Sequence, residues 1–488
     1  IYCLLHPLKK EGAAENDTAK KGSDESNIRA LYLTGMDQNA RNAAGYGRIL
    51  TAFFEEVDAA ENPADLIKCC LEFDRSYGLY SFGGIGFEAD PSDSNKKILV
   101  WIPADTGLSK EVWFSEDPTN QNRAAYFTEY LKQLCIAGGY SEEEAEEASE
   151  QTVRIMKQMA ENSLSLEDSM NPELTYNFYT PTELEELSSG AVSARMLQEI
   201  FELEPDETLV VIDVKLTEAL GSLLTTEHLP ALKEYVKLCA IRDNTLYIDM
   251  DSYEAAMDYQ LKAMGLEENM PFEEQLVEDV QYLLGFQCGR LYCRQYFPEE
   301  TIGEVEEIVK LVTEAFGKRI SELDWMSEET KAEAEKKLKT MTVRIGYPDS
   351  WPQDRYELIL DAPEEGGIYV DNILAAGKAS MEYTYETRND PVDKTLWPDT
   401  PQTVNAYYMP QDNSINLLAG ILRAPFYDPE ASEEENLGGI GTVVAHEITH
   451  AFDTSGSQFD ENGNLRDWWT SEDKAQFQRL AEEVAAYY

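Results

Sequence analysis

The sequence has few basic residues for its length and no long hydrophobic run. Its 488 residues include 40 Lys and Arg against 93 Asp and Glu, which gives a formal net charge of −53. Proteins that bind nucleic acid neutralise phosphates with an excess of Lys and Arg, so this composition excludes a general nucleic-acid-binding function. No stretch of 18 or more apolar residues is present, and we therefore expect no membrane-spanning helix in this chain.

Cysteine and histidine are also scarce. The seven Cys are scattered and include no C-x-x-C pair, which excludes a zinc ribbon and a dense disulfide framework. We expect most of them to be buried free thiols. Of the four His, His6 lies in a polar segment and His228 in a polar turn, and we expect both side chains to be solvated. The other two His belong to a single motif.

The pattern along the chain predicts a folded, mainly helical protein of more than one domain. Residues 1–27 form a polar lead-in, and helical periodicity then dominates residues 28–345. The turn-rich segment 346–352 is interpreted as a linker, and residues 353–488 as a second domain. Strand-like runs are few, with the clearest at 97–102 and a weaker one at 209–213.

Acidic runs such as 142–147 have two interpretations. Such a run is either the solvated face of a helix or part of a scaffold that recruits cationic partners. We favour the solvated face, because charge runs of this kind usually face water.

The most informative segment is Gly438–Asp453, which contains an H-E-x-x-H sequence at His446, Glu447 and His450. On a helix, residues i and i+4 share a face, so both imidazoles can reach one Zn²⁺ ion while Glu447 holds the metal-bound water. In this arrangement zinc polarises the scissile carbonyl and Glu447 serves as the general base. The motif therefore predicts a zinc metalloendopeptidase site.

Together with other segments, this motif resembles the neprilysin and endothelin-converting-enzyme family of zinc endopeptidases, which includes bacterial oligopeptidases. The sequence V-N-A-Y-Y at 404–408 precedes the zinc motif as it does in that family, and His446 lies 41 positions after Asn405. Further similar blocks follow in family order, at 31–45, 289–298, 323–331, 345–349 and 467–470.

The resemblance implies a two-lobed helical shell with a thermolysin-like zinc domain of small β content, which cleaves oligopeptides on the amino side of apolar residues. Residues 28–345 are then the chamber wall and 353–488 the catalytic lobe. By the same resemblance, Asn405 and Ala406 hold the substrate backbone, and three residues form the pocket for the apolar side chain: Ile421, Phe426 and Val443. Asp453 either orients a zinc histidine or caps the helix end. An extracytoplasmic location, secreted or surface-anchored, is favoured over a cytoplasmic one.

The chain departs from the family pattern at the third zinc ligand. Catalytic zinc sites use three protein ligands, and the resemblance places the third, a Glu, about sixty residues beyond His450, which is past Tyr488. The acids Glu472, Glu482 and Glu483 are interpreted instead as a solvated face, because 471–480 has the pattern of an amphipathic surface helix. Two hypotheses remain: the chain is most of a zinc endopeptidase with one zinc ion, or it is an inactive fragment or peptide-binding module.

Overall fold

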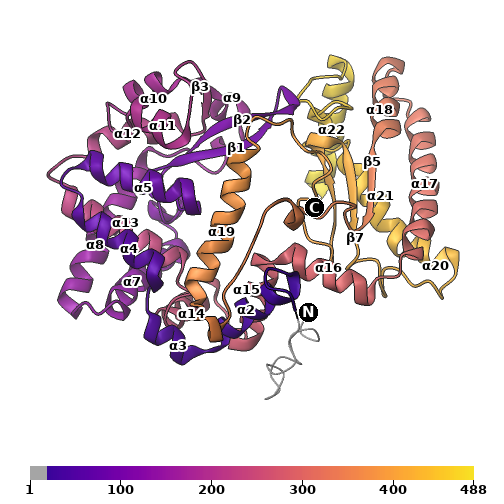
Figure 1. Cartoon of the computed structure of the whole chain (residues 1–488). Helices are drawn as coiled ribbons and strands as arrows, with labels where there is room; N and C mark the ends of the chain where they lie inside the picture. The colour runs from indigo at the N-terminus through magenta and orange to yellow at the C-terminus, as the bar shows by residue number, and fades with distance from the viewer. Residues whose placement is uncertain (1–18, 488) are drawn as a thin grey trace. The chain divides into compact units, whose positions relative to one another are not determined.

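The computed structural model describes residues 19–487, without the side chains of Met170, Pro172 and Glu173. Most of the predicted polar lead-in, including His6, lies outside the described residues. Contacts divide the chain into two units (Figure 1). Unit 1 comprises the described residues up to Glu88 together with Ile98–Leu283 and Tyr356–Arg388. Unit 2 comprises Ala89–Lys97, Leu284–Arg355 and the chain from Asn389 on.

Unit 1 is mainly helical. Its helices are α2 (Asp24–Met36), α3 (Gln38–Ala44), α4 (Gly47–Ala59), α5 (Pro63–Tyr77), α6 (Lys110–Trp113), α7 (Pro118–Ala137), α8 (Glu142–Asn162), α9 (Pro172–Thr175), α10 (Pro181–Leu187), α11 (Ala194–Phe201), α12 (Val214–Leu223), α13 (Leu229–Asp243), α14 (Met250–Met264), α15 (Phe272–Leu283) and α19 (Tyr369–Glu386). A four-stranded sheet of order β1-β2-β4-β3 lies in unit 1 except for residues Ala89–Lys97, which belong to unit 2. Its strands are β1 (Gly84–Asp90), β2 (Asp93–Ile102), β3 (Asn177–Tyr179) and β4 (Leu209–Val211). Of the strand-like runs expected from the sequence, 97–102 lies in β2, and residues 209–211 of the run 209–213 form β4.

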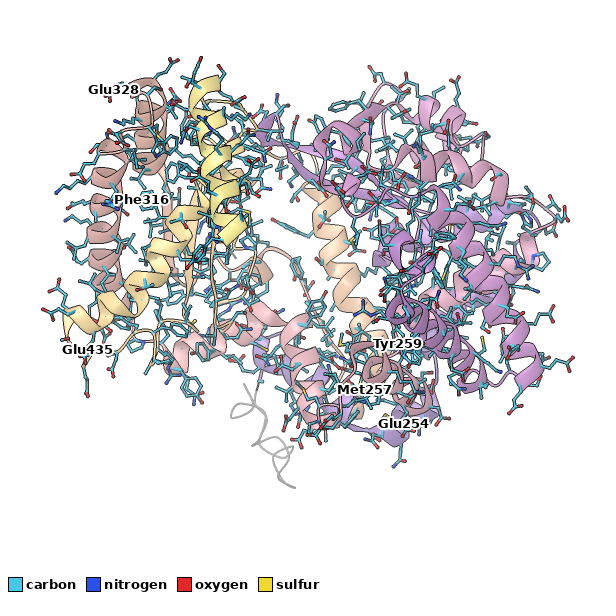
Figure 2. The ribbon with its side chains drawn as sticks, turned by 180° about the vertical axis from the view of Figure 1, so that it is seen from behind. Glu254, Met257, Tyr259, Phe316, Glu328 and Glu435 are labelled. Carbon is cyan, nitrogen blue, oxygen red and sulfur yellow. The ribbon has the colours of Figure 1, made fainter. Side chains whose placement is uncertain are left out.

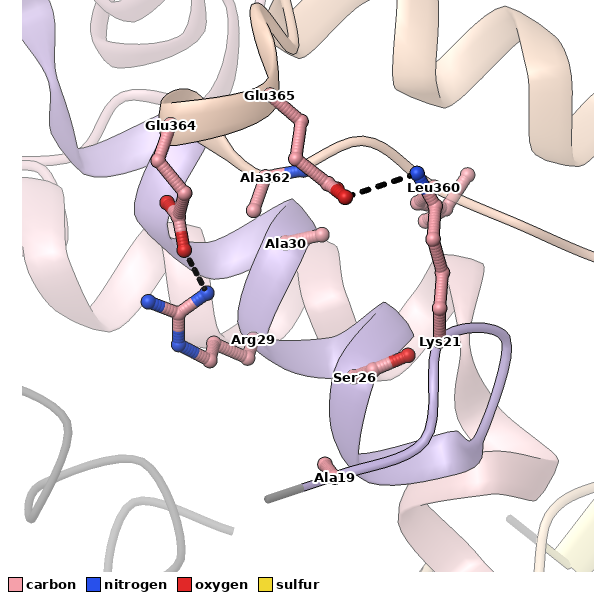
Figure 3. A pocket seen from close by; sticks show the side chains of 9 residues that line it. All are labelled: Ala19, Lys21, Ser26, Arg29, Ala30, Leu360, Ala362, Glu364 and Glu365. Carbon is pink, nitrogen blue, oxygen red and sulfur yellow. Dashed lines mark hydrogen bonds and ion pairs between the residues drawn. The ribbon is translucent and has the colours of Figure 1, made fainter. Parts of the chain in front are cut away.

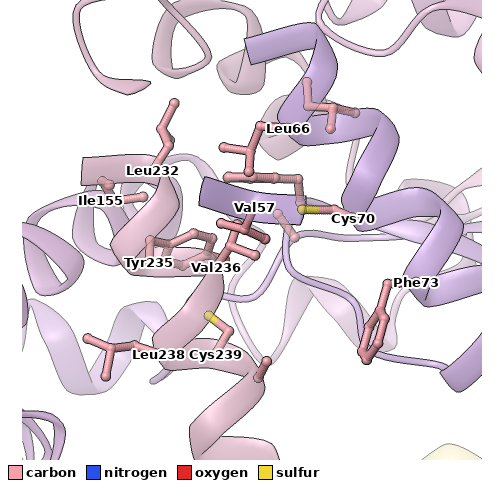
Figure 4. Close-up of a cluster of buried hydrophobic side chains, with 14 of the residues drawn as sticks. Val57, Leu66, Cys70, Phe73, Ile155, Leu232, Tyr235, Val236, Leu238 and Cys239 are labelled. Carbon is pink, nitrogen blue, oxygen red and sulfur yellow. The ribbon is translucent and has the colours of Figure 1, made fainter. Parts of the chain in front are cut away.

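The core of unit 1 forms where α4, α5, α8 and α13 meet. Figure 4 shows part of this cluster, in which Val57, Leu66 and Val236 are fully buried. Cys70 and Cys239 lie in the same cluster as free thiols, as the sequence predicts for most of its Cys. The acidic run 142–147 starts α8, where Ser141 and Glu144 form a capping box and the Glu side chains are exposed.

Ion pairs and hydrogen bonds connect the start of α2 to the segment that precedes α19. Figure 3 shows Arg29 paired with Glu364 at 2.8 Å and Lys21 paired with Glu365 at 2.9 Å. Deeper in the same contact, Asn27 donates to the Leu358 carbonyl and accepts from the Leu360 N–H. Because the buried Asn27 amide is satisfied on both sides, it fixes the register of α2 on this segment.

Unit 2 combines helices with a small mixed sheet. Its helices are α16 (Gly285–Tyr296), α17 (Glu300–Ser321), α18 (Glu328–Thr340), α20 (Glu433–Gly438), α21 (Ile440–His450) and α22 (Ser471–Tyr487). The sheet has the order β5-β7-β6, with β5 (Thr342–Gly346), β6 (Ala406–Met409) and β7 (Ser414–Leu418). β5 runs parallel and β6 antiparallel to β7, so β6 is an edge strand.

Helices α17 and α18 pack together and place side chains in the core of unit 2. Val305 and Ile308 on α17 are buried in one cluster with Ile440 and Val444 of α21. Phe316, labelled on α17 in Figure 2, stacks on Phe452 with ring centroids 5.6 Å apart. This core fixes α21, which carries the H-E-x-x-H sequence, against a long helix.

The contacts group the chain differently from the predicted boundary at 346–352. Helices α16–α18, which the sequence analysis assigned to the 28–345 lobe, belong to unit 2, and α19 belongs to unit 1. Helical periodicity shows that a residue such as Val305 is buried, but it does not show which distant segment buries it. The prediction of a mainly helical fold with little β structure is confirmed. None of the described helices has the length and apolarity needed to cross a membrane.

Candidate active site

Helix α21 is positioned by its apolar face and by the segment that enters it. Ile440, Val444 and Ile448 recur at four-residue steps and are fully buried. The Ile440 N–H donates to the Phe426 carbonyl at 2.7 Å, and a Cβ on Gly439 would lie only 2.3 Å from that oxygen. Only glycine therefore allows the close approach that sets the start of the helix.

The two histidines of the motif converge at the end of α21. His446 Nε2 and His450 Nε2 lie 3.1 Å apart, and the rings are nearly perpendicular, at 89°. Two nitrogens bound to one tetrahedral zinc ion at about 2.0–2.1 Å are about 3.3–3.4 Å from each other. The observed separation is close to that value, so the pair fits a shared metal ion.

Asp453 lies where it can orient His450. Its Oδ2 is 2.7 Å from His450 Nδ1, and its Oδ1 accepts the backbone N–H groups of Ser455 and Gly456. Burial alone would raise the pKa of Asp453, but the bonds from His450 and the two N–H groups outweigh it and lower the pKa. An ionised carboxylate only accepts, so His450 donates from Nδ1, and in the neutral ring Nε2 keeps the lone pair that a metal needs.

Glu447 is turned inward beside the histidine pair. The residue is 6% exposed, and its helix packs on strand β6. Burial raises the pKa of Glu447, and the neighbouring His446 and the backbone N–H of Tyr408 offset this only in part. A carboxylate held in such surroundings is a better proton acceptor than a solvated one, which suits a general base.

Asn405 and Ala406 lie at the start of the edge strand β6. The Asn405 carbonyl accepts from the Leu418 N–H on β7, and the Ala406 N–H donates to the Asn405 side-chain oxygen at 2.9 Å. In an antiparallel ladder successive residues point their polar groups to opposite sides. Ala406 and Tyr408 therefore direct theirs away from β7, toward the side on which the Tyr408 N–H meets Glu447.

The three residues expected to form an apolar pocket differ in their surroundings. Ile421 is buried in the unit 2 core and Val443 is half-buried against that core. Phe426 is 36% exposed and is not part of the cluster. The structure thus brings His446, Glu447, His450 and Asp453 together, and it buries the three pocket candidates to different degrees.

No third metal ligand completes the histidine pair among residues 19–487, where no group of three or more His, Cys, Asp or Glu side chains forms a metal-binding cluster. His228 belongs to unit 1, where its Nδ1 lies 2.9 Å from the Leu223 carbonyl. Its ring is half-buried and hydrogen-bonded and is not freely solvated as the sequence analysis expects.

Sequence reasoning missed Lys337 as a residue of this region. Lys337 lies on α18, is 1% exposed, and donates to the Ala451 carbonyl directly after His450. A signal was present in the sequence: Lys337 follows Thr330 and Ala334 at helical spacing, and both are buried. Lysine at such a position is rarely buried without a specific partner.

Comparison with known proteins agrees with this geometry. The sequence profile described as "Peptidase family M13" matches residues 5–348 in its N-terminal part and 405–488 in its second part. The chain is 29% identical over 419 residues to endothelin-converting enzyme 1 of Homo sapiens, which covers 84% of this chain and 54% of that protein. It is 28% identical to a putative zinc metalloproteinase of Streptococcus gordonii, over 94% of this chain and 80% of the relative.

A solved structure shows the same fold. Zinc metalloprotease Zmp1 of Mycobacterium tuberculosis, in complex with an inhibitor, aligns with a TM-score of 0.85 at 26% identity, covering 96% of this chain and 70% of its own. The chain spans 54% and 64% of the human and Rattus norvegicus endothelin-converting enzymes that it matches. Two profile matches, structural similarity over 96% of the chain and the H-E-x-x-H helix lead to one conclusion: this chain belongs to peptidase family M13, the neprilysin and endothelin-converting-enzyme-like family.

Proposed function

We propose that the protein is a zinc-dependent metalloendopeptidase that hydrolyses oligopeptides on the amino side of apolar residues. The observation that carries this proposal is the convergence of His446 Nε2 and His450 Nε2 at 3.1 Å beside the inward-turned Glu447. Membership in a peptidase family supports it. The location outside the cytoplasm that the resemblance favours is part of the same proposal.

His446 and His450 are the residues that would hold one zinc ion, and Asp453 keeps the His450 ring in the tautomer that leaves Nε2 free. When bound, zinc supplies Lewis-acid polarisation of a carbonyl and lowers the pKa of water. Glu447 takes the proton of the attacking water and passes it to the leaving amine, as its position one residue after His446 and its raised pKa favour.

The edge of β6 would hold the substrate. An extended peptide that adds to this edge meets outward polar groups of Ala406, while the Asn405 side chain lies at the same end of the strand. The preference for an apolar residue is proposed to come from Ile421, Phe426 and Val443. Phe426 is the exposed member of the three and the one that a peptide could reach without rearrangement.

Cleavage of a fluorogenic peptide with an apolar residue after the scissile bond tests the proposal. Activity of the 488-residue chain should be lost with a chelator and restored by Zn²⁺. Glu447→Gln should lower kcat by about 10²–10⁴-fold because the general base is removed. The matched control is Glu434→Gln, at an exposed position on α20. Undiminished cleavage by Glu447→Gln would overturn the role of Glu447.

The alternative is a module that binds peptides without cleaving them. The observation that favours this alternative is the edge position of β6 in its sheet, because a peptide can add to an edge strand without a metal ion. In that case the chain should bind the same peptide, measured by fluorescence anisotropy, with equal affinity in chelator and in Zn²⁺. Turnover by the zinc-loaded chain would exclude this alternative.

A further inference from the structure

Lys337 is the only lysine among residues 19–487 that is fully buried. Its ammonium donates to three backbone carbonyls, those of Ala451 at 2.9 Å, Gly456 at 2.7 Å and Phe459 at 2.7 Å. An ammonium has three hydrogens, so every donor has an acceptor. A buried charge is retained only where such compensation exists, which marks this position as a specific one.

The three carbonyls belong to one segment, residues 451–460, which we call the Asp453 turn. Ala451 begins it directly after His450, Gly456 lies in its middle, and Phe459 lies near its end. Inside the turn, the Ser457 N–H donates to the Asp453 carbonyl and the Phe459 N–H to the Gly456 carbonyl. One ammonium therefore connects the beginning, middle and end of a segment whose own hydrogen bonds are local.

The surroundings of Lys337 show what each carbonyl would keep if the ammonium were removed. Its Nζ lies 5.7 Å from the ring centre of Tyr408 and 6.0 Å from those of Phe452 and Trp468. The Trp468 indole N–H also donates to the Phe459 carbonyl at 3.1 Å, and the Phe459 N–H donates to the Gly456 carbonyl at 3.1 Å. Without the ammonium, these two carbonyls would each keep one donor, whereas the Ala451 carbonyl, directly after His450, would have to move toward water or remain unsatisfied.

We propose that Lys337 is a positioning residue of the metal site, which holds the Asp453 turn in the place from which Asp453 orients His450. The inference rests on the proposed metal-binding function of the histidine pair and adds a residue to it. Lys337 touches neither metal nor substrate; it acts through the turn. The competing interpretation is that Lys337 only stabilises the core of unit 2, with no effect on the His450 ring.

The His450 ring itself can report on the proposal. The chain has only four His, so a sample labelled with ¹⁵N in the imidazole rings gives a simple NMR spectrum. In the metal-free chain we expect His450 in the Nδ1–H tautomer, with a visible Nδ1–H signal protected by Asp453. His228 in unit 1, hydrogen-bonded to the Leu223 carbonyl, serves as an internal reference.

Lys337→Met removes the ammonium and keeps the length of the side chain. We expect the His450 Nδ1–H signal to be lost and the ring to average between tautomers, while the His228 signals stay unchanged. The matched control is Lys339→Met, two residues on, where the side chain pairs only with Glu335 on the helix surface. A folded Lys337→Met protein with the wild-type His450 signal would overturn the proposal, because a purely structural role lowers the melting temperature without changing the tautomer.

If Lys337→Met does not fold, a pH series on the wild-type chain tests the same proposal. Burial lowers the pKa of Lys337 to about 8, against the opposing effect of Asp460, Asp453 and Glu461. The one further titratable group in its aromatic surroundings, Tyr408, has a pKa raised by burial. Loss of the Lys337 proton should therefore shift the His450 resonances with a midpoint near pH 8 and leave His228 unaffected. Loss of the Lys337 proton with no shift of the His450 resonances would count against the proposal.

Zn²⁺ added to the same labelled sample separates this proposal from the proposed function. If the histidine pair binds zinc, the resonances of both His446 and His450 shift. If neither shifts, the metal site is wrong, while the metal-free tautomer of His450 still shows whether Lys337 positions the turn.

Discussion

Asp473 is expected to contribute strongly to the stability of unit 2. It lies on α22, is 4% exposed, and accepts the backbone N–H of Ser327 at 3.1 Å. The hydroxyls of Ser327 and Thr330 also donate to it. Because Ser327 is the N-cap of α18, the carboxylate satisfies the first turn of a helix from a distant segment and adds a negative charge where the helix dipole favours one.

The magnitude follows from the pKa of this carboxyl group. Burial alone would raise the pKa of Asp473, but the bonds from Ser327, Thr330 and Thr470 outweigh burial and lower the pKa from 3.8 to about 2. Each pKa unit is about 1.4 kcal/mol, so the ionised group favours the folded state by about 2 kcal/mol at neutral pH. Asp473→Asn should therefore lower the melting temperature of unit 2 by about 4–8 °C, given the usual 2–4 °C per kcal/mol for 150–250 residues.

Thermal unfolding followed by tryptophan fluorescence measures this difference. Since the folded pKa is depressed, the contribution is fully present above the unfolded pKa and is lost as the pH falls through about 2. The gap between wild type and Asp473→Asn should be constant from pH 7 to 5 and shrink to about half by pH 3. Glu472→Gln, one residue earlier and exposed, should leave the melting temperature unchanged. A gap that does not depend on pH, or an equal loss in Glu472→Gln, would refute the reasoning.

Two further substitutions test other buried positions. Asp74 is 1% exposed, and burial raises its pKa well above the ordinary value although the backbone N–H of Ile85 opposes the shift. Asp74→Asn should therefore stabilise unit 1 relative to wild type in thermal unfolding. The difference in unfolding free energy between the two proteins should grow by up to about 1.4 kcal/mol per pH unit, from about pH 4 to the raised pKa of Asp74. A difference that does not change with pH would contradict this prediction. In Gly456→Ala the new Cβ would lie 1.8 Å from the His450 carbonyl, so the Asp453 turn must open and zinc affinity in a chelator competition should fall about 10–100-fold. Gly303→Ala on α17, with open space around the new Cβ, is the control and should bind zinc as wild type does.

The parts of the structure that depend on neighbouring residues were predictable from the sequence. Residues four apart on a helix share a face, and the structure indeed brings His446 and His450 together, with Asp453 within hydrogen-bond distance three residues later. The capping box at Ser141 and Glu144 is local in the same sense and forms as the pattern indicates. These features require only helix geometry, which sequence spacing encodes directly.

The unpredicted features depend on segments far apart in the chain. Helix α17 has the pattern of a buried helix, but only its packing on Ile440 and Val444 assigns it to unit 2. Lys337 is 114 residues from Ala451, and Asp473 is 146 residues from Ser327. A single sequence shows that α18 has a buried face, but it does not show which carbonyls or carboxylates the rest of the chain brings to that face.

Asp473 and Lys337 act on the same helix, and this makes their variants informative as a pair. Asp473 holds the first turn of α18, whereas Lys337 lies seven or more residues further along, about 10 Å or more at 1.5 Å per residue. Fraying of the first turn costs stability but leaves the contacts between Lys337 and the Asp453 turn intact. Asp473→Asn should thus lower the melting temperature of unit 2 and keep the Nδ1–H signal of His450. Asp473→Asn is therefore a destabilised control for Lys337→Met. If both variants lose the Nδ1–H signal, the tautomer of His450 responds to a general loosening of unit 2. If only Lys337→Met loses it, the tautomer depends on the position of the Asp453 turn.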